Sequence, residues 1–235
     1  MITLAFDTSA KIASVAVLDG EKTLALYSID NGLTQSELIL PMAENMLSSL
    51  KLSFADVGLF ATSVGPGSFT GVRIGVSLVK GLAFGKDIPC AEVSTIEALA
   101  ENLRGLSGII VPVMDARRNQ VYTATFDSRL GDLSRLTEDR AISLNELYGE
   151  LSEYKNEKIY LVGDGYDTAY RALSDFGLAL ETTPDILRGE SAASVGRVGY
   201  EKYKRGECIK ETELSPVYLR LPQAERERLE RLEKK

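Results

Sequence analysis

Apolar and polar residues alternate in short runs at the start of the chain and then recur at helical spacing. Residues 2–7, 13–18 and 22–29 are apolar runs bounded by polar residues, and an Asp19-Gly20 turn joins the last two. This pattern predicts a three-stranded antiparallel meander. A helix is expected over residues 35–50, with Pro41 either kinking it or marking its start. Its apolar face consists of Leu38, Ile39, Met42, Met46 and Leu50.

A glycine-dense run, Gly65–Gly75 (GPGSFTGVRIG), lies between a strand predicted over residues 57–63 and a helix predicted over residues 71–84. Glycines at a helix N-terminus can expose N–H groups that favour an anion or a closely packed partner. Spacing excludes a Walker loop, which needs a lysine, and a dinucleotide loop, whose third glycine is replaced by Thr70. A purely structural strand-to-helix turn is the alternative. The helix is expected to face inward through Val72, Val76, Val79 and Ala83.

The second half of the chain repeats the opening pattern. A strand predicted over residues 109–114 ends at Asp115, and a strand predicted over residues 120–126 ends at Asp127. These two acids stand twelve residues apart, as do Asp7 and Asp19. The repetition indicates two related lobes, with chance similarity as the alternative. Further predicted elements are capping boxes at Ser94 and Ser143, a strand over 158–162, a helix from Ser191 to Lys204 and a charged helix over 222–235.

The order of elements predicts an α/β protein in three parts. Residues 1–104 form the first lobe, which carries the glycine run. Residues 105–190 form a second, reduced lobe, and residues 191–235 form a C-terminal helix and tail that return to the first lobe.

The amino-acid composition excludes several classes of function. The 235 residues are 44% hydrophobic and carry a net charge of −7, which argues against binding nucleic acid without a partner. The apolar runs are too short to span a membrane, and the N-terminus lacks a signal peptide, so we expect a cytoplasmic protein. The chain contains no histidine, which excludes Ser-His-Asp catalysis and histidine metal sites. Cys90 and Cys208 fit no disulfide framework or zinc spacing.

Several motifs together resemble one family. The chain is similar to the bacterial TsaB (YeaZ) family over nearly its whole length, and the glycine run is the most specific of the shared motifs. The others are Asp7-Thr8-Ser9, Leu40-Pro41-Met42, Val93-Ser94-Thr95, Asp115-Ala116-Arg117-Arg118, Gly163-Asp164-Gly165 and Pro216-Val217-Tyr218-Leu219-Arg220.

The resemblance implies the actin-like ATPase (ASKHA) fold, with two lobes that each contain a mixed sheet flanked by helices. It also implies a role in making threonylcarbamoyladenosine at the adenosine 3′ to the tRNA anticodon, as a non-catalytic scaffold. The implied partners are the catalytic paralogue TsaD, which uses a threonylcarbamoyl-adenylate made by TsaC, and the ATPase TsaE. A homodimer is a further implied assembly, and tRNA would be reached only through the complex.

Residues at two motifs agree with a non-catalytic role. Aligning Val93-Ser94-Thr95 with the motif of TsaD places Thr95 and Leu99 where TsaD has its metal-binding histidines, and neither side chain can replace an imidazole. Gln35 stands where many TsaB proteins have histidine. No catalytic residue and no metal-binding residue is therefore predicted.

The resemblance also implies a docking face. Two helices of the first lobe would pair with TsaD, or with a second copy of the chain, as a four-helix bundle. Burial of all their apolar residues within the chain is the competing interpretation. The residues predicted to contact a partner are Ser36, Leu38, Ile39, Met42, Phe69, Val72, Arg73, Ile74 and Leu78.

An enzymatic alternative rests on the duplicated acids. In the actin-like fold, acids that end the first strand of each lobe can hold Mg²⁺–nucleotide, so the alternative function is an ATP-dependent kinase or ATPase. We expect no required cofactor and at most weak ATP or ADP–Mg binding at a subunit interface. A metalloprotease is disfavoured because histidine is absent. The residues predicted for nucleotide or anion contact are Asp7, Thr8, Ser9, Gly65, Gly67, Ser68 and Asp115.

Overall fold

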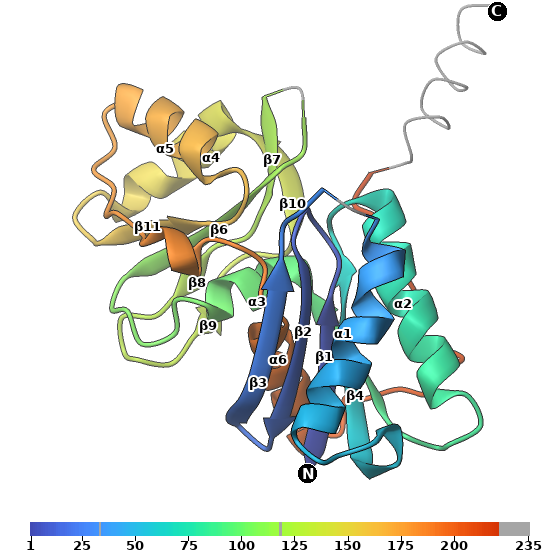
Figure 1. The fold of residues 1–235 in the computed structure, drawn as a ribbon. Helices are drawn as coiled ribbons and strands as arrows, with labels where there is room; N and C mark the ends of the chain where they lie inside the picture. Colours follow the sequence, from blue (N-terminus) through green and yellow to red (C-terminus); the bar gives the residue numbers. More distant parts are fainter. Residues whose placement is uncertain (33, 118, 221–235) are drawn as a thin grey trace, which may run out of the picture.

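The computed structural model describes residues 1–32, 34–117 and 119–220, arranged as two α/β lobes side by side (Figure 1). Arg118 and the charged helix predicted over 222–235 lie outside the described residues. Within those three ranges, no helix combines the length and the apolar composition needed to cross a bilayer.

The first lobe is built on a five-stranded sheet in the order β3-β2-β1-β4-β5. The predicted meander is confirmed, because β1 pairs antiparallel with β2 and β2 with β3. On its other side β1 pairs parallel with β4, and β4 with β5, so the sheet is mixed. The strands are β1 (Ile2–Asp7), β2 (Ala13–Asp19), β3 (Lys22–Ile29), β4 (Val57–Gly65) and β5 (Cys90–Ser94).

Two helices cover one face of this sheet, with the 3₁₀ turn η1 (Phe54–Asp56) between them in sequence. Helix α1 (Gln35–Ser49) runs through Pro41, so the proline does not mark its start. Helix α2 (Phe69–Ala83) begins two residues before its predicted start, because Ser68 caps it. The predicted inward face of α2 is confirmed by the burial of Val72, Val76, Val79 and Ala83.

The second lobe contains a six-stranded sheet, and one strand prediction for it is wrong. The single strand expected over 120–126 divides into β7 (Gln120–Thr123) and β8 (Phe126–Asp127). The division has a cause that lies twelve residues away: the Thr125 N–H donates to Thr137 Oγ1 at 2.8 Å, outside the ladder. The remaining strands are β6 (Ile109–Asp115), β9 (Ser134–Arg135), β10 (Arg140–Ser143) and β11 (Ile159–Val162).

The two sheets share a connectivity. The order β10-β7-β6, with β11 parallel to β6 on its other side, repeats the order β3-β2-β1-β4. The repeated acids hold matching places, since Asp19 lies opposite Ile2 and Asp127 lies opposite Ile109. The second lobe also contains α4 (Leu144–Leu151), α5 (Tyr166–Asp175) and the 3₁₀ turns η2 (Ser152–Tyr154) and η3 (Asp185–Leu187).

The capping box predicted at Ser143 is present, and the one predicted at Ser94 is half formed. Ser143 caps α4 with a complete capping box, in which the Glu146 carboxylate accepts from the Ser143 N–H at 2.7 Å. Ser94 accepts from the Glu97 N–H at 3.1 Å, whereas the Glu97 carboxylate lies 3.7 Å from Arg135. The hydroxyl of Ser94 also donates to Asp139 Oδ2 at 2.5 Å, which connects this cap to the second lobe.

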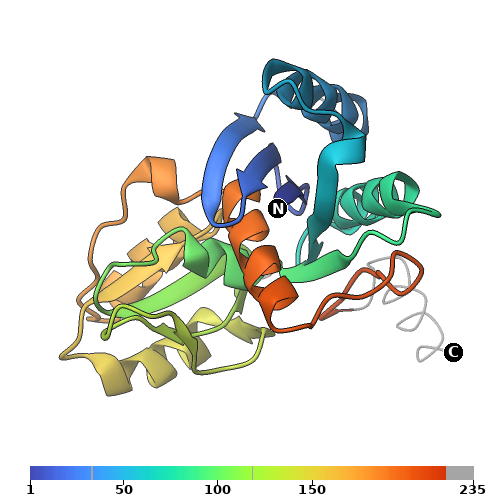
Figure 2. The ribbon, with the colours of Figure 1, turned by 90° about the horizontal axis from the view of Figure 1, so that it is seen from below.

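Two helices meet between the lobes. Helix α3 (Thr95–Glu101) packs its Ile96 and Leu99 against the second sheet, although it follows the last strand of the first. Helix α6 (Ala192–Lys204) comes from the far end of the chain and covers the second face of the first sheet. Figure 2 shows α6 between the two lobes. The predicted boundary between the lobes after residue 104 stays a prediction. Helix α3 lies before that boundary in sequence, yet it packs on the sheet of the second lobe.

Candidate functional site

The glycine run is packed against the end of β1. A Cβ atom added to Gly67 would collide with the Ser9 carbonyl, and one added to Gly71 would collide with the Thr8 carbonyl. A Cβ at Gly75 would lie 2.6 Å from Thr8 Oγ1. Such separations are too short for non-bonded atoms, so side chains at these positions are excluded. The glycines therefore allow the Asp7-Thr8-Ser9 turn to rest directly on the start of α2.

Two N–H groups of this loop, those of Ser68 and Gly71, donate within the chain. The Ser68 N–H donates to the Ser9 carbonyl at 2.6 Å, and the Gly71 N–H donates to Ser68 Oγ at 3.2 Å. Thr8 Oγ1 donates to the Gly71 carbonyl at 2.7 Å. A phosphate cradle needs free donors and open space in front of them. This geometry therefore weighs against the nucleotide contact predicted for the loop.

The Asp7 side chain stabilises the same turn by accepting hydrogen bonds. Its Oδ1 accepts from the Ser9 N–H at 2.9 Å, from Ser9 Oγ at 2.6 Å and from Ser63 Oγ at 2.8 Å. Oδ2 is buried without a hydrogen-bond partner among the described residues. Burial raises the pKa of the Asp7 carboxyl above its usual value, and the three hydrogen bonds oppose that rise. Asp7 thus serves as a buried turn cap.

Asp115 occupies the matching place in the second lobe but differs in environment. It is exposed, its Oδ1 accepts from the Arg117 N–H at 2.7 Å, and its own N–H donates to Asp164 Oδ1 at 3.0 Å. Among the described residues, no three or more acidic or cysteine side chains lie where they could hold a metal ion. The Mg²⁺–nucleotide contact predicted for Asp7 and Asp115 stays a prediction, and the two acids differ because Asp7 is buried and Asp115 is exposed.

Glu190 is a site residue that the sequence did not reveal. It precedes α6 at the crossing between the lobes, is only 5% exposed, and its Oε1 has no partner within the described ranges. Burial, assisted by repulsion from Asp7, Asp164 and Asp30, raises its pKa to about 8. A glutamate between Gly189 and Ser191 reads as a solvated loop residue, so no sequence signal marked it.

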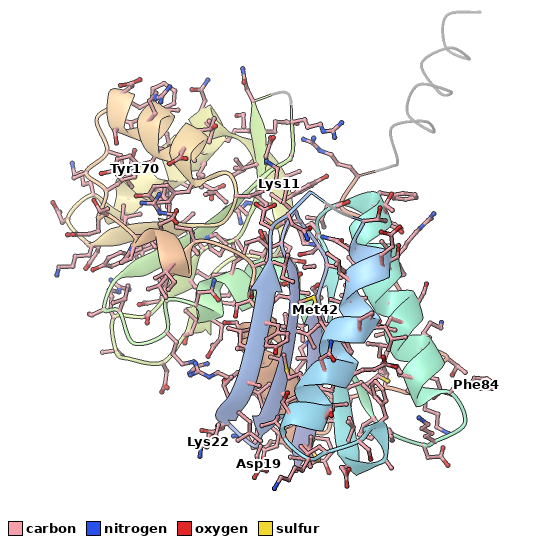
Figure 3. The ribbon with its side chains drawn as sticks, viewed as in Figure 1. Lys11, Asp19, Lys22, Met42, Phe84 and Tyr170 are labelled. Carbon is pink, nitrogen blue, oxygen red and sulfur yellow. The ribbon has the colours of Figure 1, made fainter. Side chains whose placement is uncertain are left out.

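Three residues predicted to contact a partner are core residues instead. Ile39 and Met42 of α1 and Val72 of α2 are buried in the cluster that joins these helices to the first sheet. The Met42 side chain can be found on α1 in Figure 3. The sequence suggested more apolar positions than one buried stripe needs, but the two helices share a wide sheet face, which accommodates them.

The outer surface of the two helices is smaller than predicted. Ser36 and Arg73 are exposed, and Phe69, Leu38, Ile74 and Leu78 are partly exposed. Phe84, which follows α2 and was not predicted, is 76% exposed and extends away from the body of the protein (Figure 3). The exposed positions on α2 recur at helical spacing and form its outward face: Thr70, Arg73, Ser77 and Gly81.

An aromatic and cationic cluster marks the first turn of α2. The Arg73 guanidinium lies 3.7 Å from the centre of the Phe69 ring, and Arg73 Nε donates to the Tyr218 hydroxyl at 2.7 Å. The rings of Phe69 and Tyr218 are 4.9 Å apart. Tyr218 therefore joins the predicted docking residues Phe69 and Arg73, although it is distant in sequence.

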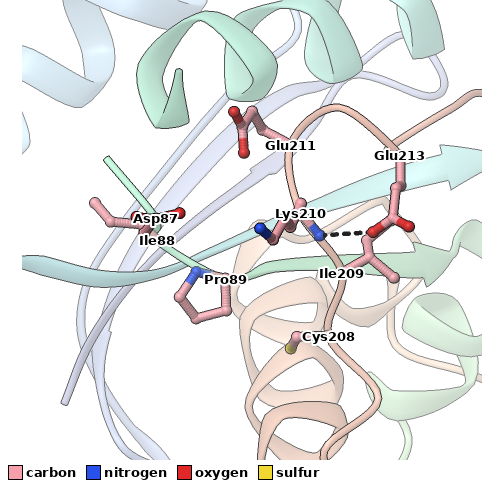
Figure 4. A pocket seen from close by; sticks show the side chains of 8 residues that line it. All are labelled: Asp87, Ile88, Pro89, Cys208, Ile209, Lys210, Glu211 and Glu213. Atoms are coloured by element: carbon pink, nitrogen blue, oxygen red, sulfur yellow. Dashed lines mark hydrogen bonds between the residues drawn. The ribbon is translucent and has the colours of Figure 1, made fainter. Parts of the chain in front are cut away.

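The two cysteines lie on opposite faces of the first sheet. Cys90 begins β5, and Cys208 follows the end of α6. Cys90 belongs to the core under α1 and α2, and Cys208 packs with α6. Figure 4 shows Cys208 in a small surface pocket beside Pro89 and Lys210. Burial raises the pKa of the Cys90 thiol to about 12, so this thiol is not a reactive nucleophile.

Comparison with known proteins identifies the family. Residues 34–227 match the family model of TsaD, described as tRNA N6-adenosine threonylcarbamoyltransferase. The chain is 33% identical to the tRNA threonylcarbamoyladenosine biosynthesis protein TsaB of Bacillus subtilis, over 96% of each chain. The chain belongs to the TsaB (YeaZ) family. The TsaB family predicted from the glycine run and its companion motifs is thereby confirmed.

Solved structures agree on the fold. YeaZ from Pseudomonas aeruginosa matches with a TM-score of 0.76 at 23% identity, covering 93% of this chain and 99% of that one. The Acidaminococcus fermentans (R)-2-hydroxyglutaryl-CoA dehydratase component A matches with a TM-score of 0.51 at 10% identity, covering 87% and 99%. The chain thus has the actin-like ATPase fold that the resemblance implied, with the two lobes that the repeated pattern indicated.

Proposed function

We propose that this chain supports threonylcarbamoyladenosine formation on tRNA as a non-catalytic subunit that docks on TsaD in the cytoplasm. The observation that carries the proposal is the match to TsaB over 96% of both chains. TsaE is the second partner proposed, and tRNA is reached through the complex because a net charge of −7 disfavours holding it alone.

The site geometry supports a non-catalytic role. The chain has no histidine, and Thr95 and Leu99, which align with the metal-binding histidines of TsaD, are buried in α3. The glycine loop is filled by the Asp7-Thr8-Ser9 turn. We therefore propose that the chain needs no nucleotide cofactor, and that the loop serves to fix where α2 begins.

The outward face of α2 is the proposed docking surface. Ile74 and Leu78 lie side by side next to the exposed Ser77 and Gly81, so a partner helix can approach the backbone closely beside apolar side chains. A Cβ on Gly81 would meet nothing within 4 Å, which shows that this surface is open. The same face would serve a homodimer in the absence of TsaD.

Reconstitution tests the proposed function. The chain is mixed with TsaD, TsaE, tRNA and threonylcarbamoyl-adenylate, and the mass of the complex and the modified tRNA are measured. We expect a complex with TsaD and modification that depends on this chain. Full modification in its absence would contradict the proposal.

A substitution on α2 tests the docking surface. Ser77→Arg places a long charged side chain on the exposed face, so TsaD affinity should fall at least about tenfold, by steric and charge exclusion. Ser174→Arg makes the same change at an exposed position of α5 and should leave affinity unchanged. Calorimetric titration of each variant with TsaD measures the effect; equal affinities would show that docking uses another face.

A further inference from the structure

Residues 212–220, here called the C-terminal strap, run from α2 to the second lobe. The beginning of the strap contacts α2. Lys80 Nζ donates to the carbonyls of Thr212 at 3.2 Å and Leu214 at 3.1 Å. Leu214 is buried in the core under α1 and α2, and the Ser215 N–H donates to Glu92 Oε1 at 2.9 Å. The strap is therefore fixed to the first lobe before it reaches the glycine loop.

The strap next contacts the end of β4. The Val217 N–H donates to the Val64 carbonyl at 2.7 Å. Gly65 has a φ of +116°, and a Cβ atom there would collide with the Val217 carbonyl. Gly65 thus gives the strap its closest approach to the sheet. Beyond it, Tyr218 binds Phe69 and Arg73 at the first turn of α2, as described above.

The strap then crosses to the second lobe. Arg220 Nη1 donates to the Ala116 carbonyl at 2.7 Å, Arg220 Nη2 donates to Gln120 Oε1, and the guanidinium lies 5.6 Å from the centre of the Tyr122 ring. These residues belong to the β6–β7 hairpin. Only Leu219 separates Tyr218, held on the first lobe, from Arg220, held on the second.

We propose that Tyr218 and Arg220 are positioning residues that hold the first turn of α2 and the β6–β7 hairpin in a fixed relative orientation. A segment of three residues has little slack, so a movement of the second lobe transmits to Phe69 and Arg73 through the strap. The consequence for partner binding rests on the proposed function, because it assumes that α2 meets TsaD. The coupling between the lobes does not depend on that assumption.

Amide hydrogen exchange of the full chain tests the coupling. Arg220→Ala removes charge-assisted hydrogen bonds, so exchange should accelerate about tenfold at residues 120–122, at Val217 and also at residues 69–73, which Arg220 does not contact. Arg220→Lys keeps the charge and a donor and should restore part of the protection. Arg129→Ala removes an arginine paired with Asp127 and Glu157 and should leave all three regions unchanged.

A second variant tests transmission in the other direction. Tyr218→Phe keeps the ring but removes the acceptor of the Arg73 bond, and should accelerate exchange at residues 69–73 and, more weakly, at 120–122. If each variant affects only the region that it contacts directly, or neither affects any region, the coupling is overturned.

Binding to TsaD separates this inference from the proposed function. If wild-type chain does not bind TsaD, the proposed function fails while the exchange result still decides the coupling. If it binds, Arg220→Ala should weaken binding together with faster exchange at residues 69–73. Weaker binding with unchanged exchange there would mean that Arg220 contacts TsaD directly, and would overturn the positioning role.

Discussion

Between pH 5 and pH 8 the free energy of unfolding should fall by about 3 kcal/mol through Glu190 alone, and Glu190→Gln should remove that fall. The folded chain holds a proton on Glu190 up to about pH 8, whereas the unfolded chain releases it near the ordinary value of 4.5. Unfolding therefore releases a proton in this window, and rising pH favours the unfolded state. Above the folded pKa the contribution becomes constant.

Urea titrations at pH 5, 6.5 and 8 measure this slope. Glutamine has the size of a protonated glutamate and cannot ionise, so the variant isolates the charge. Glu207→Gln is the control: Arg205 lowers the pKa of Glu207, so this side chain ionises below pH 5 in both states. If the free energy of unfolding changes with pH to the same extent in wild type and Glu190→Gln, Glu190 does not carry the buried proton.

Gly71→Ala should destabilise the chain by about 3 kcal/mol, because its new methyl group would be forced into the Thr8 carbonyl. The backbone there has little freedom to yield, since Thr8 Oγ1 and the Gly71 carbonyl are hydrogen-bonded. The denaturation midpoint in urea, followed by circular dichroism, measures the loss.

Gly81→Ala provides a control within the same helix. Its added methyl group meets nothing within 4 Å, so only helix propensity changes, and stability should rise by about 0.5–1 kcal/mol. A similar loss in both variants would show that helix propensity, rather than contact with the Asp7-Thr8-Ser9 turn, explains the glycine at position 71.

The sequence predicted elements whose signals are local. The Asp19-Gly20 hairpin, the valine face of α2 and the Ser143 capping box each depend on residues within one or two turns, and each is present. The break at Ala124–Thr125 was missed because its cause, the Thr137 hydroxyl, lies twelve residues away. The alternation of apolar and polar residues along a strand cannot reveal that a distant side chain will accept a backbone hydrogen bond in place of the neighbouring strand.

The site was predictable to the extent that it is continuous in sequence. The glycine run is one continuous segment, so the strand-to-helix turn that it forms could be predicted. The sequence leaves open whether Ile39, Met42 and Val72 face the core or a partner, because helical spacing gives a face but not the width of the sheet opposite it. Tyr218 reaches the site from a distant segment, Glu190 is buried just before α6, and no local pattern marks either residue.

The position of α6 has a consequence for how the protein folds. The second face of the first sheet, formed by residues such as Ala5, Ala16 and Leu18, is covered by a helix that begins at residue 192. During synthesis this apolar face must wait for almost the entire chain to emerge. The N-terminal lobe is therefore the last to be completed, and nascent chains that end before α6 would expose a surface on which chaperones can act.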